Sequence, residues 1–496
     1  MNRTPVRAAL CFLLICIAIS AVSAGRINLK DPLRLPDDQT LKAIYLFPHW
    51  WDPWKSDDAA LTTDLQSIRG LGFNTVCLDH EVSQAVDREW YWLDREYKLA
   101  GQEKMCVLPW LQLQCVDRNA LMKFSHLTLK QAVNQDKQPE DDCINYRDGE
   151  FVKALTHYIS VYLDRYASDP ALLKIKDGKK LRPVVGLMVE TGWRNTTGLP
   201  LSFDDETNAY FRKWMKASYH DLNDLNSKWG TSYKSFDEID PCDKAVFNYA
   251  SPDKGNMPMA VVEHCRFRAR IINDALVDVI KQVRKRHKDV LFAAEVAYPF
   301  SVDHPDANVY RWNDANEYKA VEAADIIFIR TVGNTTEGQV AKEQELIMLN
   351  GKKLILAYRF FDDAFSGRAV SFGLDCASSA NGLAYYNWNE TADNSSAVYN
   401  RPEKQAFVKL MVDTYDMLYD TDKRHAVTQP SAPPVPAAVP APVEAAPVEA
   451  APAPTAVEPA PTPAPAEVAP VPAPVPVPAE PAPAPLSAPV PAEAPK

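Results

Sequence analysis

The middle of the chain alternates short apolar runs with longer amphipathic ones, and this alternation constrains the fold more than any other feature. A parallel sheet wrapped by helices has this pattern. The strand candidates cover residues 42–47, 73–78, 104–108, 183–189, 290–294, 324–329, 352–357 and 382–386. Eight strands, each followed by a helix, predict an α/β fold of the (β/α)8 TIM-barrel class.

Amphipathic helices are expected between these strands and after the last one. The longest covers residues 261–287, where apolar residues recur at three- and four-residue spacing and form one apolar face. Its basic end, residues 284–288, suits a helix C-terminus rather than a nucleic-acid site. The other helices are expected over residues 57–70, 88–100, 150–166, 204–219, 317–323, 338–349, 368–380 and 402–420.

The two ends of the chain differ from the middle. Two arginines, an apolar run over residues 8–22 and small residues at 23–25 are typical of a secretory signal peptide. The run is short for a membrane span of about 20 residues, and no later run is long enough for one. Residues 430–496 are almost only Pro, Ala, Val and Glu, which favours an extended chain without a core.

These ends define the expected organisation. We expect a signal peptide over residues 1–24, a (β/α)8 barrel domain over 25–425 and a disordered Pro/Ala-rich tail over 426–496. The mature protein is then secreted, periplasmic or on the cell surface, with no membrane span, and its tail is a candidate for contact with the cell envelope.

The net charge and the cysteine and histidine residues limit which ligands and partners are expected. A net charge of −11 without a basic stripe argues against nucleic acid. Seven cysteines follow the signal segment, none at Cys-x-x-Cys spacing, and an odd number leaves at least one free thiol or an intermolecular bond. The histidines are scattered, so no metal and no organic cofactor is implied, although His49 and His80 leave a two-histidine site as an alternative.

In a (β/α)8 barrel the active site lies at the carboxyl ends of the strands, so polar and aromatic residues there are candidates. They are His49, Trp50, Trp51, Trp54, Asp79, His80, Glu81, Trp110, Gln112, Gln114, Glu190, Trp193, Glu295, Tyr298, Arg330, Tyr358, Arg359, Asp362, Asp363, Tyr386, Asn387, Trp388, Asn389 and Glu390. Aromatic faces stack on sugar rings, and carboxylates and amides bond sugar hydroxyls. The set therefore predicts a carbohydrate site.

Three carboxylates are the catalytic candidates, because glycoside cleavage usually needs one carboxyl as acid and one as nucleophile or base. Glu190 directly follows the fourth strand; the alternative is a capping or salt-bridged carboxylate at the barrel rim. Glu295 has apolar neighbours; the alternative is a buried carboxylate paired with Arg330 or Arg359. Asp362 follows the seventh strand, and the alternative for it is an exposed acidic loop.

Aromatic and polar residues at the strand ends are the candidates for substrate binding. Three tryptophans cluster after the first strand, and Trp388 ends the last, which adjoins the first in a closed barrel; the alternative is that they cap the core. The candidate binding residues are His49, Trp50, Trp51, Trp54, Glu81, Trp110, Trp193, Tyr298, Arg330, Arg359, Tyr386, Asn387 and Trp388.

One stretch carries a family pattern. Tyr-Phe-Arg-Lys-Trp-Met at residues 210–215 is followed by Leu-Asn-Ser-Lys-Trp-Gly-Thr at 225–231. It resembles the segment after the fourth strand of glycoside hydrolase family 42 β-galactosidases and related clan A barrels, where Phe-Arg-x-Trp-Leu precedes Leu-Asn-x-x-Trp-Gly-Thr. The resemblance implies a barrel whose acid/base is Glu190, 21 residues before Phe211.

The sequence departs from that family at its catalytic motifs. Val189 stands where the family has the asparagine before its acid/base. The seventh strand carries no glutamate, and Asp362 and Asp363 follow late. The resemblance thus implies the fold more strongly than the chemistry.

The sequence therefore predicts a secreted glycoside hydrolase that cleaves a glycan with two carboxyl groups. The alternatives are a non-catalytic carbohydrate-binding barrel, which the departures favour, and an envelope or surface structural protein in which the tail is the functional part. Two carboxylates facing each other across the barrel mouth would distinguish the enzyme from the binder.

Overall fold

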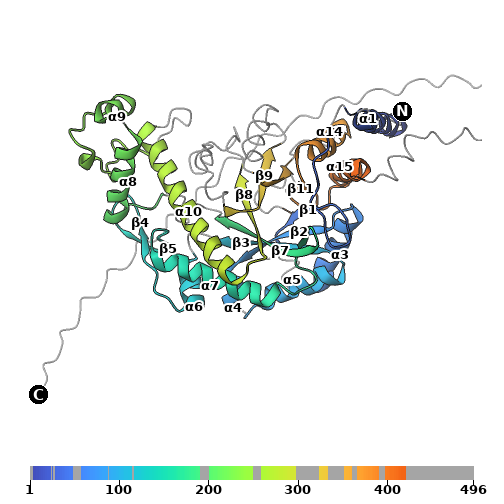
Figure 1. Cartoon of the computed structure of the whole chain (residues 1–496), viewed down its shortest axis with the longest axis horizontal. Helices are drawn as coiled ribbons and strands as arrows, with labels where there is room; N and C mark the ends of the chain where they lie inside the picture. Colours follow the sequence, from blue (N-terminus) through green and yellow to red (C-terminus); the bar gives the residue numbers. More distant parts are fainter. Residues whose placement is uncertain are drawn as a thin grey trace, which may run out of the picture. The chain divides into compact units, whose positions relative to one another are not determined.

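The computed structural model describes residues 4–23, 25, 28–48, 57–87, 89–113, 117–189, 200–219, 221–249, 258–297, 323–332, 351–359, 366–389 and 397–419. Within this part of the chain eight parallel strands form a closed barrel with helices around it (Figure 1). The predicted TIM-barrel fold is therefore confirmed.

The barrel strands follow one another in chain order around the ring. They are β1 (Lys42–Leu46), β2 (Thr75–Glu81), β3 (Cys106–Leu113), β7 (Lys180–Val189), β8 (Leu291–Ala297), β9 (Ile326–Val332), β10 (Lys353–Arg359) and β11 (Leu383–Tyr385). Each barrel strand pairs with the next barrel strand along the chain, β3 with β7 included. The ring closes where the first strand, β1, pairs with the last, β11.

Several strands run further than their apolar runs suggested. β2 continues to Glu81 instead of residue 78, and β3 to Leu113 instead of residue 108. Asp79 therefore pairs with Trp110 inside the ladder rather than lying in a loop after it. The reason is the two-residue period of a strand, which lets polar side chains alternate with apolar ones to the end of the ladder.

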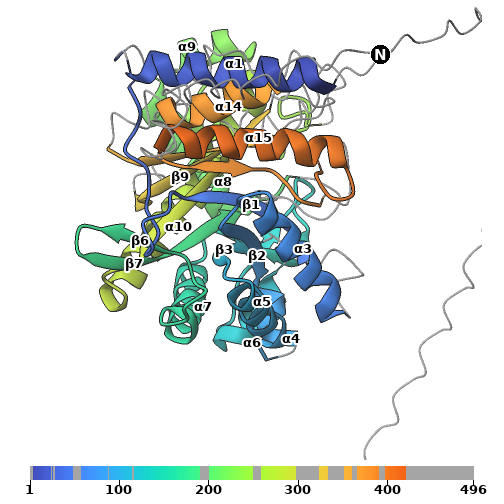
Figure 2. The ribbon, with the colours of Figure 1, turned by 90° about the vertical axis from the view of Figure 1, so that its right-hand side faces the viewer.

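Helices cover the outside of the barrel (Figures 1 and 2). They are α3 (Asp58–Gly70), α4 (Val82–Asp87), α5 (Tyr91–Gln102), α6 (Arg118–Ser125), α7 (Gly149–Tyr166), α10 (Met259–Arg286), α14 (Ser366–Ser379) and α15 (Pro402–Tyr419). α5 begins later than residue 88 because Glu89 and Trp90 have left-handed backbones, with φ of 48° and 72°. The helices expected over residues 317–323 and 338–349 lie outside the described residues, apart from residue 323.

Aspartates begin four of the helices. Each accepts a backbone N–H from the first turn, which satisfies a donor that the helix itself cannot. The caps are Asp57 for α3, Asp148 for α7, Asp204 for α8 (Asp205–Ser218) and Asp221 for α9 (Leu222–Trp229).

Short elements that the sequence did not predict lie between the barrel units. β4 (Gln131–Val133) and β5 (Pro139–Ile144) form a hairpin, and β6 (Lys174–Asp177) pairs antiparallel with β7. The helix expected over residues 204–219 is present as α8, whereas α9 and a 3-10 turn at Phe236–Glu238 were not predicted. α8 and α9 pack on α10, and the 3-10 turn packs on α8. The unpredicted elements are too short for hydrophobic periodicity to reveal them.

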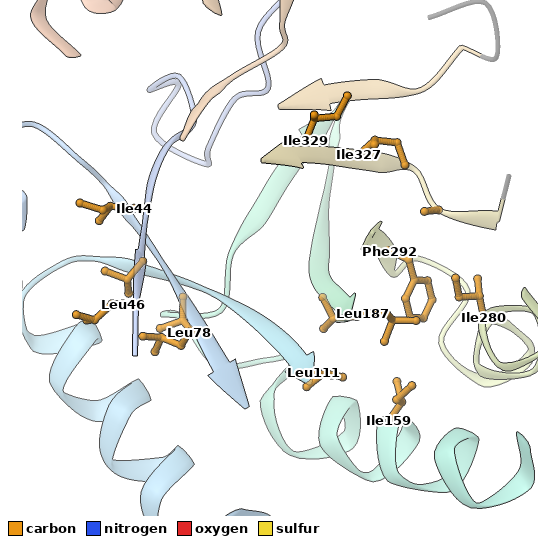
Figure 3. Packing of buried hydrophobic residues seen from close by; sticks show 14 of the residues in the cluster. Ile44, Leu46, Leu78, Leu111, Ile159, Leu187, Ile280, Phe292, Ile327 and Ile329 are labelled. Atoms are coloured by element: carbon orange, nitrogen blue, oxygen red, sulfur yellow. The ribbon is translucent and has the colours of Figure 1, made fainter. Parts of the chain in front are cut away.

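The described residues contain two apolar clusters. One lies between strands and helices and includes Leu187, Phe292, Ile280 and Ile159, which Figure 3 shows between β7, β8 and the neighbouring helices. The other takes alternate residues from the eight strands and none from a helix, so it fills the barrel interior.

The N-terminal helix α1 (Thr4–Ser23) lies along α14 and α15 (Figure 2). Ile15 and Ile19 are buried there. Among the described residues, none of the helices combines the length and the apolar character needed to cross a membrane.

Candidate active site

Glu295 projects into the barrel from β8. It alternates with Leu291 and Ala293, which both belong to the interior cluster, so its side chain shares their face. One carboxylate oxygen, Oε2, accepts a hydrogen bond of 2.9 Å from the Tyr45 hydroxyl. Glu295 as a whole is half-buried, and its second carboxylate oxygen, Oε1, is buried in the barrel.

Aromatic rings fill the barrel beside Glu295. We call Tyr45, Phe47, Trp110, Phe328 and Tyr386 the aromatic floor. Tyr45 stacks on Trp110 at 6.1 Å between ring centroids and 12° between planes, and Tyr386 lies 5.0 Å from Tyr45. Phe328 meets Trp110 edge-on at 5.2 Å, and Phe47 meets Tyr386 at 5.7 Å. These rings are buried, apart from the half-buried Phe47, and they fill the barrel interior next to a carboxylate.

Gly186 on β7 makes room for this floor. A Cβ atom at Gly186 would lie 2.3 Å from Cε3 of Trp110 and 2.7 Å from Cδ2 and Cζ3. The indole of Trp110 therefore lies directly on the backbone of the neighbouring strand. Only glycine permits that approach.

The thiol of Cys77, on β2, lies in the same interior. Burial raises the pKa of Cys77 far above its ordinary range, contact with Trp110 opposes part of that rise, and the negative charge of Glu295 adds to it. Cys77 is therefore a neutral thiol at physiological pH, and a neutral thiol is a poor nucleophile.

Asp79 and Glu81 follow Cys77 on alternate positions of β2. Both are buried, and 8% of Glu81 is exposed. Ser83 Oγ donates to Glu81 Oε2 at 3.0 Å, and the Glu81 N–H donates to Gln84 Oε1 at 3.2 Å. These bonds tie Glu81 to the first turn of α4.

His80 points away from the barrel. Its Nδ1 lies 2.6 Å from the Tyr162 hydroxyl and its Nε2 lies 2.9 Å from Glu96 Oε2, in the layer between β2 and the helices α5 and α7. Both ring nitrogens are thus occupied by protein groups. Nowhere in the described ranges do three His, Cys, Asp or Glu side chains cluster as metal ligands.

The end of β11 forms the seam of the barrel. Trp388 is 1% exposed, packs edge-on against Tyr399 at 6.1 Å and belongs to the cluster between strands and helices. The Asn389 side-chain amide bonds both the N–H of Phe47, at 3.2 Å, and its carbonyl, at 3.3 Å. Asn387 is buried and donates to the Asn389 carbonyl at 2.7 Å.

A sugar could stack on Trp388 only if the surrounding side chains moved. The same holds for Trp110, which is buried in the floor, and for Tyr358, which is buried against Phe372 at 4.5 Å. Tyr386 is also largely buried, and its ring belongs to the floor.

Many predicted site residues fall where the structure gives no description. His49, Trp50, Trp51, Trp54, Gln114, Glu190, Trp193, Tyr298, Asp362, Asp363 and Glu390 lie outside the described residues. For Gln112, Arg330 and Arg359 the backbone alone is described; Arg330 pairs with Ala297 on β8 and with Ala357 on β10. Their roles at the site stay predictions.

The sequence analysis missed Tyr45 and Phe47. Both lie in the apolar run of the first strand, and attention to residues after the strand ends passed over them. The period of two through Ala43, Tyr45 and Phe47 is the signal that could have placed them on the interior face.

Five cysteines of the described part of the chain are thiols outside any disulfide: Cys16, Cys77, Cys106, Cys242 and Cys376.

Comparison with known proteins supports the resemblance drawn from residues 210–231. Residues 195–343 match the family model for glycoside hydrolase family 42, described as β-galactosidase. The resemblance to that family is thereby confirmed over this segment. No curated protein sequence matches the chain.

Solved structures share the fold. The catalytic domain of β-amylase from Paenibacillus polymyxa superposes with a TM-score of 0.52 at 12% identity, over 76% of this chain and 98% of that one. The β-galactosidase from Rahnella sp. R3 gives 0.52 at 14% identity, over 79% and 58%. That from Halorubrum lacusprofundi gives 0.50 at 14%, over 77% and 58%. The chain thus spans 58% of the length of these two β-galactosidases.

Proposed function

We propose that this protein is a secreted glycoside hydrolase that cleaves a glycan with two carboxyl groups. The observation that carries the proposal is Glu295, a half-buried carboxylate inside a closed (β/α)8 barrel, held by Tyr45 beside the aromatic floor. The match of residues 195–343 to a glycoside hydrolase family supports the same reaction class.

The chemistry needs a second carboxyl group, and Glu190 is the candidate. It directly follows β7, and β7 pairs with β8, which carries Glu295. In this assignment Glu190 protonates the departing oxygen, and Glu295 is the ionised partner that acts as nucleophile or activates water. The carboxyl separation distinguishes the two: roughly 5–5.5 Å for retention of the anomeric configuration, roughly 6.5–9.5 Å for inversion.

The test begins with the purified protein and a panel of aryl glycosides and polysaccharides. On the sugar that is cleaved, Glu190→Gln should lower kcat by about 10²–10⁴-fold, since general acid catalysis typically contributes that much. An aryl glycoside with an activated phenol should lose less than a natural glycan, because its leaving group needs little protonation. Equal losses on both substrates would contradict the acid role.

Glu295→Gln should abolish turnover on both kinds of substrate, because a nucleophile or base is needed whatever the leaving group. Glu103→Gln is the matched control. Glu103 caps the carboxyl end of α5 and bonds Gln66, away from the barrel interior, so turnover should stay unchanged. Full activity of Glu295→Gln would refute the assignment.

A non-catalytic carbohydrate-binding barrel is the second candidate, and one observation favours it. β10 reads Lys-Leu-Ile-Leu-Ala-Tyr-Arg and carries no carboxylate, although the resembled family has its nucleophile on the seventh strand. Binding of a glycan by calorimetry without release of reducing ends would support this candidate over the hydrolase.

A further inference from the structure

We propose that Tyr45 is the positioning residue of Glu295: its hydroxyl fixes one carboxylate oxygen and thereby the direction in which the carboxylate meets a glycan. The proposal rests on the proposed glycosidase function, and it adds a residue that is absent from the strand-end candidates. It follows from the geometry of the aromatic floor.

The first step is that contacts on all sides hold Tyr45 in place. It is 1% exposed, and its ring lies against Trp110 and Tyr386. Its backbone is fixed as well, because β1 pairs with β2 on one side and the Trp388 N–H donates to the Tyr45 carbonyl at 2.8 Å on the other. The hydroxyl is therefore presented from a rigid base, as a preorganised site requires.

The second step concerns the direction of the hydrogen bond. An ionised carboxylate can only accept, so Tyr45 is the donor in the 2.9 Å contact with Oε2. A hydrogen bond to an ionised group is stronger than one between neutral groups, and it offsets part of the cost of placing a charge among rings. The Tyr45 hydroxyl thus fixes the place of Oε2 and leaves Glu295 oriented by a donor that does not move with the substrate.

The third step separates this role from packing. Tyr45→Phe keeps the ring and its contacts in the floor and removes only the hydroxyl. A matched control exists in Tyr158, a fully buried tyrosine on α7 whose ring packs against Trp90 outside the barrel. Tyr158→Phe makes the same chemical change away from Glu295.

The experiment is a double-mutant cycle on the full-length protein. On the substrate found in the glycoside panel, Tyr45→Phe should lower kcat by about 10- to 100-fold, the amount expected for one hydrogen bond to a charged group, with KM little changed. Tyr158→Phe should leave kcat and KM unchanged. For the affinity of a competitive inhibitor that resembles the transition state, Tyr45→Phe should weaken binding in the wild-type background but not in the Glu295→Gln background.

Two results would overturn the proposal. One is that Tyr45→Phe weakens inhibitor binding equally in the wild-type background and in the Glu295→Gln background. The other is that Tyr45→Phe behaves like Tyr158→Phe in every assay.

A failure of the glycosidase proposal can be distinguished from a failure of the Tyr45 proposal. If the wild type cleaves no glycan, the cycle is read from urea unfolding of the four proteins. Non-additive shifts of the unfolding midpoint would support a stabilising interaction between Tyr45 and Glu295, and additive shifts would refute it.

Discussion

The tightest contact at the candidate site predicts the effect of Gly186→Ala. The new methyl group would lie 2.3 Å from Trp110 Cε3, whereas carbon atoms in contact are normally about 3.5–4.0 Å apart. The indole must therefore move by more than about 1 Å. It has little room to do so, because Tyr45 stacks on one face of it and Phe328 meets its edge.

The magnitude follows from two opposing effects. Overpacking of a core costs about 1–3 kcal/mol, and replacing a strand glycine by alanine returns up to about 1 kcal/mol of backbone entropy. We expect a net loss of about 1–2 kcal/mol in the free energy of unfolding. Turnover should fall as well, since a displaced Trp110 moves Tyr45, and Tyr45 holds Glu295.

Urea unfolding followed by circular dichroism measures the loss, and Gly101→Ala is the matched control. Gly101 lies in α5, where the added methyl would lie 3.5 Å from the Ala171 Cβ, an ordinary contact. That variant should be stabilised by up to about 1 kcal/mol. If Gly186→Ala proved as stable and as active as Gly101→Ala, the account of the aromatic floor would be wrong. In a Trp110→Leu background the cost of Gly186→Ala should largely disappear.

Three further predictions concern the rest of the chain. Burial, and to a lesser extent the charge of Arg268, lowers the pKa of His264 well below 6.5. Below about pH 6.5 the unfolded chain therefore binds a proton that the folded chain does not. The free energy of unfolding should fall there by up to about 1.4 kcal/mol per pH unit. Urea unfolding at pH 7.5 and 5.5 measures this, and an equal slope in His264→Gln would contradict it. The mature protein should begin near Gly25, which N-terminal sequencing of exported material checks; a start at Met1 would count against export. Deleting residues 430–496 should leave melting temperature and turnover unchanged, because this composition has no apolar periodicity to pack; a loss of several degrees would refute that.

The barrel was predictable because apolar runs and amphipathic helices are physical requirements of a sheet covered on its outer face. The ends of the strands were not predictable. In β2 the inner face carries Asp79 and Glu81, so the apolar run ends earlier than the pairing with β3. Reading the period of two past the apolar run corrects this error.

Side-chain direction at the candidate site was the weaker part of the prediction. Glu295 was identified and its neighbour Tyr45 was not, because a side-chain contact between β1 and β8 across the barrel is invisible in a linear sequence. His80 and Trp388 have the residue types of a sugar site, yet His80 faces the helices and Trp388 packs beyond the last residue of β11, where strand alternation no longer fixes its direction. Residue type therefore selects candidates, and only the tertiary contacts separate the site from the core.

The seam between the first and last strands also determines when the barrel can close during synthesis. The Asn389 amide that bonds Phe47 lies 342 residues further along the chain, and β1 has no second neighbour until β11 arrives. At roughly 5–20 residues per second, a ribosome needs roughly 20–70 seconds to make that intervening stretch. During this time the growing chain carries an open sheet edge, which can pair with strands of other chains. If the protein is exported, the same delay keeps the barrel open until synthesis is nearly complete. The chain can therefore still pass through a translocation channel in an unfolded form.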